Sequence, residues 1–434
     1  MSIVTIEFMM LNGGFKLNVG EPNVNGEGLY GDLVRCLHNP GSAEPWKTAT
    51  PELKLSMAQL VAKYGKLLPA LHRLNKKIQA MNIGEKFLVA ENMPSDTSER
   101  SKLEALVEVL NQHDVSQVKV EWEKRTNEMK NFVGELLQSY NIFTPRFDIR
   151  ITLGNVKKDD RECRFCSGTL ASGSLFTKVA HAVPEALGNK TLILGDECDI
   201  CNKYFGDSVE PHLIESFDIY RAFLGVRGKN GLPHLKYPGA EITHHEGIPV
   251  IIAKKIEFTE SSISVDLGGS RKLTPAKLYR ALCKITLSVL DEKHLIGLED
   301  TVAWIRNDQP SVALPKVGTN ILPVKNDDPQ LSVAVFIRKN DDYTLPHIVT
   351  EFRFGWFVYV YILPFSRLDK QGFTSDTEFE RFWSFFPMYC QTKNWTFEDL
   401  HSTKEITIKD SINVKNNSQN GTKPIDDADK QLEI

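Results

Sequence analysis

Four cysteines in two CxxC pairs are the residues whose types and spacing most directly indicate chemistry. The first pair is Cys163 and Cys166, the second is Cys198 and Cys201, and 31 residues separate the pairs. Each pair can form a tight turn that presents both sulfurs to one side, so that four thiolates surround one Zn²⁺ ion. In a reducing compartment such motifs favour a zinc site over a disulfide framework. Four cysteine ligands complete the coordination sphere, so the expected zinc is structural, and a catalytic step would need a second metal ion.

A strand and a helix are predicted on either side of a turn within this region. The sequence LFTKVAHAV, residues 175–183, alternates like a strand and stops at Pro184, which cannot extend a sheet ladder. Gly188 and Asn189 then indicate a turn. The second cysteine pair leads into a predicted helix with Asn202 in its first turn. A strand, a turn and a helix held together by zinc could form a cup for a metal ion.

The order of these motifs resembles the zinc-containing HNH endonucleases of the ββα-metal (His-Me finger) superfamily. The elements that carry the resemblance are CxxC, AHxxPExLGN and CxxCNxxFG, within residues 163–210. The resemblance implies that His181 is the general base that takes a proton from the water attacking a phosphodiester. It also implies that Asn202 helps to hold a catalytic divalent ion, Mg²⁺ or Mn²⁺, and that the four cysteines hold the structural zinc. A histidine with a pKa of about 6.5 suits such a role near neutral pH.

One position departs from the family pattern. Many HNH enzymes carry an acidic residue or a histidine directly before the base as a metal ligand, whereas this sequence has Ala180. Glu185 lies in a loop that could fold towards the ion, and it is the first candidate to replace the missing ligand. Glu210 is the second candidate, eight residues after Asn202. That spacing is about 12 Å along an unbroken helix, so Glu210 could reach the ion only if the helix breaks at Gly206.

Basic residues after the zinc module are candidates for contact with a nucleic-acid backbone. They are Arg221, Arg227 and Lys229. A later predicted helix, PAKLYRALCKITLSVL, places Lys277, Arg280 and Lys284 on one face. A solvated face is the favoured interpretation of these three charges, and contact with phosphates is the alternative.

Composition excludes several classes of protein. The chain has 434 residues, of which 41% are hydrophobic and 25% charged, as in soluble globular proteins of more than one domain. The formal net charge of -4 gives no overall attraction to nucleic acid, so a nucleic-acid site must be a local patch. No apolar run reaches the roughly 20 residues needed to span a bilayer. The N-terminal sequence lacks the features of a secretory signal, so we expect a cytoplasmic protein without a membrane partner.

Changes in sequence pattern divide the chain into four parts. Residues 1–150 are expected to be a mostly helical region, because apolar residues recur at helical spacing from Pro51 onward. Residues 151–232 form the zinc module, and residues 233–396 mix strand and helix patterns, which predicts an α+β domain. Residues 397–434 are polar and predicted to be a disordered tail. The predicted fold class is therefore a multidomain α+β protein, whose helical N-terminal region could bind a partner protein or a second copy of the chain.

The sequence thus predicts a metal-dependent HNH endonuclease that hydrolyses phosphodiester bonds in DNA. Fold analogy alone connects such an enzyme with host defence, including antiviral defence, or with mobile elements. One alternative is a non-catalytic zinc-ribbon module that binds nucleic acid or protein, in which Ala180 marks a lost active site. A thiol redox protein that uses its CxxC pairs is another, and it predicts no stoichiometric zinc.

Overall fold

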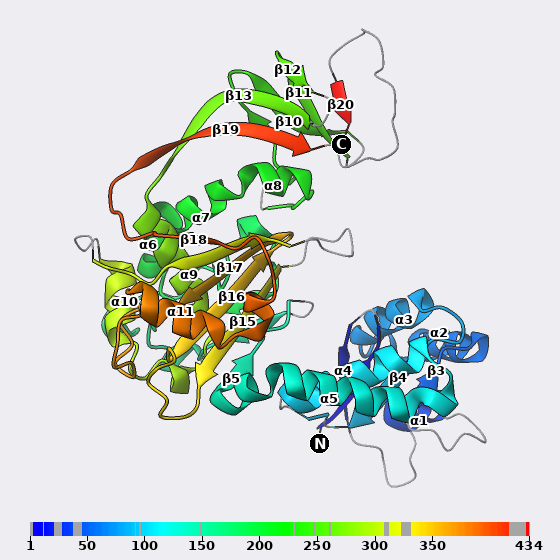
Figure 1. Ribbon diagram of the computed structural model, residues 1–434. Coiled ribbons are helices and arrows are strands. Elements are labelled where there is room, and N and C mark those ends of the chain that lie inside the picture. The colour runs from blue at the N-terminus through cyan, green and yellow to red at the C-terminus, as the bar shows by residue number, and fades with distance from the viewer. Residues whose placement is uncertain are drawn as a thin grey trace. The chain divides into compact units, whose positions relative to one another are not determined.

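The chain forms two compact units, Met1–Leu137 and Gln138–Ile434, each with its own apolar core (Figure 1). The computed structural model describes residues 3–11, 13–20, 28–37, 46–91, 93–94, 97–147, 150–155, 157–228, 231–245, 248–259, 262–307, 312–322, 331–415 and 431–433. Both units combine helices with β-sheets, so the predicted α+β class is confirmed. Within the described residues, no helix is long and apolar enough to cross a membrane.

The N-terminal unit combines helices with a four-stranded antiparallel sheet. Its helices are α1 (Leu29–Leu37), α2 (Pro51–Tyr64), α3 (Ala70–Ala80), α4 (Thr97–Gln112) and α5 (Val115–Ser139), the last of which ends in the second unit. Its strands are β1 (Ile3–Met9), β2 (Phe15–Gly20), β3 (Trp46–Thr48) and β4 (Lys86–Glu91), in the spatial order β2-β1-β4-β3. Leu17, Leu71 and Phe87 are fully buried between sheet and helices. The expected helices are present, but the sequence did not predict this sheet. Its strands pair with partners far apart in the sequence, and no pattern within a single strand shows that pairing.

One detail of the predicted helices differs from the structure. The helical pattern over residues 51–82 corresponds to two helices, because a turn containing Pro69 separates α2 from α3. A proline lacks the backbone N–H that a continuing helix would need.

A six-stranded antiparallel sheet forms the centre of the second unit. Its strands are β5 (Tyr140–Phe143), β14 (Val317–Ile321), β15 (Leu331–Arg338), β16 (Ile348–Phe354), β17 (Phe357–Ile362) and β18 (Thr396–Glu398), in the order β18-β14-β17-β16-β15-β5. The helices α9 (Pro275–Val289), α10 (Glu299–Arg306), α11 (Asp376–Ser384) and α12 (Pro387–Cys390) also belong to this unit. The hydroxyl of Tyr279 in α9 donates to the carbonyl of Ile362 at 2.7 Å, and Tyr361 in β17 donates to the carbonyl of Leu282 at 2.7 Å. These bonds fasten α9 to the sheet.

The zinc module contains a three-stranded sheet followed by helices. Its strands are β6 (Ile151–Leu153), β7 (Ala180–His181) and β8 (Leu192–Leu194), in the order β6-β8-β7. The helices are α6 (Asp199–Ser208), α7 (Glu210–Ser216) and α8 (Asp218–Phe223). β7 pairs antiparallel with β8, and α6 follows, so the predicted order of strand, turn and helix is present. The strand predicted over residues 175–183 is limited to Ala180–His181 and ends before Pro184.

Helix α9 and the zinc module share one apolar core. Phe205 and Leu213 of the module lie in the same buried cluster as Leu278, Leu282 and Ile285 of α9. The sequence places these segments in separate domains, 151–232 and 233–396, whereas the core is continuous across that boundary. The two segments are therefore one structural unit.

The polar C-terminal segment differs from the prediction. Residues Ile406–Lys415 form strand β19, which pairs antiparallel with β13 (Ser262–Leu273) next to β12 (Ile256–Phe258). Ile412 is buried in a small core with Ile242 and Val265. A further sheet contains β9 (Leu235–Lys236), β10 (Ala240–His245), β11 (Ile248–Ala253) and β20 (Gln431–Glu433). The expectation of disorder over 397–434 is thus wrong for the paired residues, where alternating apolar residues supply a buried face.

Candidate active site and zinc centre

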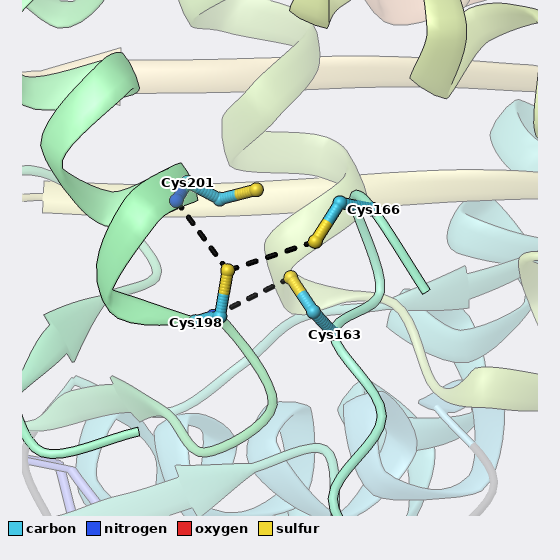
Figure 2. A group of neighbouring side chains, drawn as sticks. All are labelled: Cys163, Cys166, Cys198 and Cys201. Carbon is cyan, nitrogen blue, oxygen red and sulfur yellow. Dashed lines mark hydrogen bonds between the residues drawn. The ribbon is translucent and has the colours of Figure 1, made fainter. Parts of the chain in front are cut away.

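The four cysteines converge on one point, as Figure 2 shows. Their sulfur atoms all lie within 4.8 Å of one another, and the Sγ atoms of Cys166 and Cys198 are 3.6 Å apart. In a tetrahedral site with Zn–S bonds of about 2.3 Å, the sulfurs are about 3.8 Å apart. Within the described part of the chain, this is the one group of three or more His, Cys, Asp or Glu ligand atoms this close together.

The closely packed thiols shift one another's pKa values. Hydrogen bonding from Cys201 lowers the pKa of Cys163 to about 5, whereas burial raises the pKa of Cys198 to about 11. The hydrogen bond to Cys163 also raises the pKa of Cys201. Four thiolates packed this closely repel one another unless a positive ion lies between them. The donor set and the geometry therefore fit a zinc ion held by all four cysteines.

A buried arginine anchors the first cysteine pair to α9. Arg164 forms a bidentate ion pair with Asp196, with N–O distances of 2.8 and 2.9 Å. Its guanidinium also donates to the carbonyls of Leu287, Ser288 and Leu290 at the end of α9. Those carbonyls at the helix terminus have no partner within the helix, so the arginine satisfies them. The zinc centre is consequently fixed to the helix that fastens to the central sheet.

His181 occupies the last position of β7, opposite Ile193 of β8. Its side chain is 19% exposed, and its Nε2 lies 3.7 Å from Oε2 of Glu185. Nδ1 is buried and has no hydrogen-bond partner among the described residues. The preceding Ala180 is 1% exposed and belongs to the apolar core, because neighbouring strand residues point to opposite faces. An acidic ligand at position 180 would therefore point into this core.

Burial is the largest influence on His181 and lowers its pKa below the ordinary value. The negative charges of Glu185 and Glu210 raise this pKa, and they oppose the effect of burial. The positive charges of Lys284 and Arg150 lower it further. The net lowering keeps the imidazole neutral near neutral pH, and the neutral ring is the form that can accept a proton.

The loop between β7 and β8 is held by Asn189. Its side-chain amide donates to the carbonyls of Val183 and Leu192, and its oxygen accepts from the backbone amides of Thr191 and Leu192. Gly188 has φ = 92°, a left-handed conformation that favours glycine. Gly188 and Asn189 form the turn that returns the chain from β7 to β8. This structural role explains why they belong to the motif, and it requires no part in catalysis.

Glu210 reaches the neighbourhood of His181 because the helix breaks before it. The chain departs from helical geometry at Val209 (φ -121°, ψ -57°), between α6 and α7, and Glu210 is the first residue of α7. A break at Gly206 was expected to be necessary, and the structure places it three residues later. Asn202 lies half-buried in the first turn of α6, where its backbone amide donates to the carbonyl of Cys198.

Two buried charged residues that the sequence did not single out for this site lie behind it. The Lys284 Nζ is 2.9 Å from Glu210 Oε1 and 3.3 Å from Glu197 Oε2. Burial raises the pKa of Glu197 to about 7. Burial alone would lower the pKa of Lys284, but the two carboxylates raise it above the ordinary value. Glu197 directly precedes Cys198 and Lys284 lies in a distant helix, so no motif spacing connects them.

Helix α9 is a buried helix, contrary to the solvated face favoured by the sequence. Arg280 and Lys284 are 2% and 1% exposed, and the guanidinium of Arg280 lies 5.3 Å from the centre of the Trp304 ring. The sheet and the zinc module both pack on this helix, so neither residue can follow a phosphate backbone in this conformation. Lys277, on the same helix, is half-buried.

The predicted nucleic-acid contacts are only partly described. Arg221 forms an ion pair with Asp218 at 2.6 Å and is 13% exposed, whereas Arg227 is exposed. Lys229 lies outside the described residues. Arg150, which was not predicted, is exposed just before β6, and its charge acts on His181. Of the two positive charges that lower the pKa of His181, Lys284 is buried and Arg150 is exposed to solvent.

Comparison with known proteins identifies the centre of this region. Residues 163–218 match an HNH endonuclease family, which confirms the resemblance inferred from the cysteine and histidine motifs. The matched span covers the four cysteines, both β7 and β8, and the helices α6 and α7. It ends well before Lys284. No curated protein and no solved structure matches the chain.

Proposed function

We propose that the protein is a metal-dependent endonuclease that hydrolyses phosphodiester bonds in DNA, with His181 as its general base. The observation that carries this proposal is the contact between His181 and Glu185 within the HNH-matched span. His181 ends β7, Glu185 lies 3.7 Å from its ring, and Glu210 lies near enough for its charge to affect the imidazole pKa. The neighbouring four-cysteine cluster supports a structural zinc that holds the strands and α6 in place.

Glu185, Glu210 and Asn202 are the residues that would hold a catalytic Mg²⁺ or Mn²⁺. Carboxylate and amide oxygens are the ligands that these hard ions prefer. A bound divalent ion stabilises negative charge on the phosphate and on the leaving oxygen. With few protein ligands, it also leaves coordination positions for phosphate and water. Glu185 replaces the ligand that many HNH enzymes carry at the position of Ala180.

His181 would accept the proton of the attacking water through Nε2. Nε2 is the nitrogen beside Glu185, whereas Nδ1 is buried. The lowered pKa keeps the ring unprotonated near neutral pH, so that it can act as a base before each turnover. Arg150 is exposed and its charge acts on His181, which makes it a candidate to bind a phosphate next to the one that is cleaved.

A cleavage assay that compares wild type with His181→Ala tests this proposal. The substrates are duplex DNA, single-stranded DNA and RNA, each with Mg²⁺, Mn²⁺ or Ni²⁺. We expect wild type to cleave DNA and His181→Ala to lose at least about a hundredfold in rate, the usual scale for a general base. His234→Ala, an exposed histidine near β9, is the matched control and should cleave like wild type.

Each alternative has its own outcome in this experiment. If neither wild type nor His181→Ala cleaves any substrate with any ion, the non-catalytic zinc-ribbon alternative replaces the enzyme. Cleavage of RNA alone would overturn the choice of DNA. Elemental analysis of the same preparation should find one zinc per chain, whereas a thiol redox protein would contain none. A role in host defence or mobile elements stays a prediction from fold analogy.

A further inference from the structure

We propose that Lys284 is a positioning residue of the nuclease site, supplied by α9 from outside the HNH-matched span. The inference rests on the proposed function, since it concerns the same site. It follows from three contacts of one buried ammonium group with the chain segments that carry His181 and Glu210. The active site is then a composite of the zinc module and the C-terminal part of the second unit.

The Lys284 ammonium has three oxygen atoms around it. Nζ donates to the backbone carbonyl of His181 at 2.9 Å and lies 2.9 Å from Glu210 Oε1. Its third neighbour is Glu197 Oε2, at 3.3 Å. Of the three N–H donors of a lysine ammonium, one is accepted by the His181 carbonyl, and the contacts with Glu210 and Glu197 are ion pairs. One side chain of α9 therefore links the end of β7, the start of α7 and the residue before Cys198.

Burial makes this arrangement specific. The Lys284 side chain is 1% exposed, Glu197 is fully buried, and the ammonium lies 5.8 Å from the centre of the Phe205 ring. Burying a charge is costly unless it is paired and hydrogen-bonded, and a hydrophobic replacement is often at least as stable. Stability alone therefore gives no strong reason for a lysine here. A requirement to place two functional groups does give one.

Each contact places a group that the proposed chemistry uses. The bond to the His181 carbonyl fixes the backbone at the end of β7 and, through it, the position of the imidazole. The ion pair holds Glu210 by Oε1, so this contact does not use Oε2. Glu210 needs such a support because it follows the non-helical Val209. Partners that orient metal ligands in this way typically affect metal affinity or activity about 10- to 100-fold.

The test compares Lys284→Met and Lys284→Arg with wild type. Methionine keeps a long flexible side chain without the charge, and arginine keeps the charge and the donors. Lys277→Met is the matched control, because it makes the same change two turns earlier on the same helix. The measurements are Mn²⁺ affinity by calorimetry, kcat and KM for DNA cleavage, zinc content and melting temperature.

We expect Lys284→Met to keep its zinc, to bind Mn²⁺ at least about tenfold more weakly, and to lose kcat by a similar factor with little change in KM. Lys284→Arg should recover part of both losses, and Lys277→Met should match wild type. Unchanged Mn²⁺ affinity and kcat in Lys284→Met would overturn the inference. A rise in KM alone would overturn it too, since that result would mean substrate binding rather than positioning.

If Lys284→Met fails to fold, the double variant Lys284→Met/Glu197→Gln replaces it in the same measurements. It removes the buried carboxylate that Lys284→Met leaves without its cation. If the double variant also loses its zinc, Lys284 is structural and the inference fails. The two proposals fail in different ways: a wild type that binds Mn²⁺ but cleaves nothing contradicts the proposed function, and the Mn²⁺ titration still decides the role of Lys284. A wild type that binds no Mn²⁺ contradicts both.

Discussion

His181 Nε2 lies 3.7 Å from Oε2 of Glu185, four residues further along the chain. The loop that carries Glu185 turns back towards β7, because Asn189 ties it to the carbonyls of Val183 and Leu192. A carboxylate therefore stands beside the imidazole although position 180 is an alanine in the core. This relationship leads to the predictions on metal binding that follow.

Replacing either candidate carboxylate should weaken binding of the catalytic ion. Glu185→Gln and Glu210→Gln each remove a charged oxygen ligand, so Mn²⁺ affinity and kcat should both fall on the order of 10- to 100-fold. Calorimetry and cleavage kinetics measure these effects. Glu162→Gln, an exposed residue of the same module, is the control. Wild-type Mn²⁺ affinity in both variants would remove these residues from the metal site.

Introducing the acidic residue found in many HNH enzymes should not improve this protein. Ala180→Asp places a carboxylate at a position that is 1% exposed in an apolar core. The variant should melt at a lower temperature, because burying an unpaired carboxylate costs several kcal/mol, and its Mn²⁺ affinity should not rise. Ala171→Asp makes the same change at an exposed position of the module and should melt like wild type. Tighter Mn²⁺ binding by Ala180→Asp would show that position 180 can face the ion.

Removal of the zinc should unfold the module. A structural zinc contributes on the order of 10 kcal/mol of binding free energy to folding. Cys198→Ser, or a strong chelator, should therefore lower the melting temperature and release one zinc per chain. Cys390→Ser, an exposed cysteine outside the cluster, should retain the metal. A chelated protein that melts like the untreated one would argue against a structural role.

Arg150 should contribute to substrate binding rather than to the chemical step. It is exposed, and its charge acts on His181. Arg150→Gln should raise KM and reduce the slope of log affinity against log salt by about 1, as expected for the loss of one phosphate contact. The control is Lys255→Gln, at an exposed lysine far along the chain. An unchanged salt dependence would exclude the contact with phosphate.

A buried histidine of the second unit should make stability depend on pH. Burial, followed by the charge of Arg338, lowers the pKa of His347 to about 4, and its Nδ1 contacts Ser366 Oγ at 2.8 Å. The unfolded chain has the ordinary value of about 6.5, so it binds a proton first as the pH falls. The stabilising contribution is therefore complete above pH ~6.5 and is lost towards pH ~4, by up to about 3 kcal/mol.

The difference between wild type and His347→Gln isolates this contribution. Asp369, which accepts from the His347 backbone amide and also has a raised pKa, is present in both proteins. The contributions of Asp369 and of the neighbouring His294 to the pH dependence of stability therefore largely cancel when the melting temperatures of the two proteins are subtracted. Melting temperatures measured from pH 8 to pH 4 should converge or cross as the pH falls. Parallel curves would contradict the proposed role of His347.

The four-cysteine cluster, a strand at His181 and helix α6 could be predicted because their signals are local. Two CxxC pairs, an alternating segment before Pro184 and a helical pattern after the second pair are all visible within 50 residues of sequence. The break at Val209 has a signal two residues further on, because Pro211 suits the first turn of α7 but would disrupt the interior of one continuous helix. The exact position of the break, directly before Glu210, is seen only in the folded chain.

Long-range packing explains the remaining differences. The charges of α9 have the spacing of a solvated face, but two layers of the protein cover this helix, and Lys284 finds its partners more than 70 residues away in sequence. The tail around Ile412 is polar overall, yet its alternating isoleucines pair with β13 and fill a small core. Patterns within a segment do not reveal which other segment will supply its partner.

The guanidinium of Arg164 reaches the last carbonyls of α9, and the module and α9 fill one core. For protein engineering, the HNH-matched residues 163–218 are consequently not a portable cassette. Cut out alone, they would expose the apolar face that meets Leu278 and Leu282 and would leave Arg164 without its acceptors. A minimal fragment for transplantation or crystallisation has to retain α9 and the sheet that carries it.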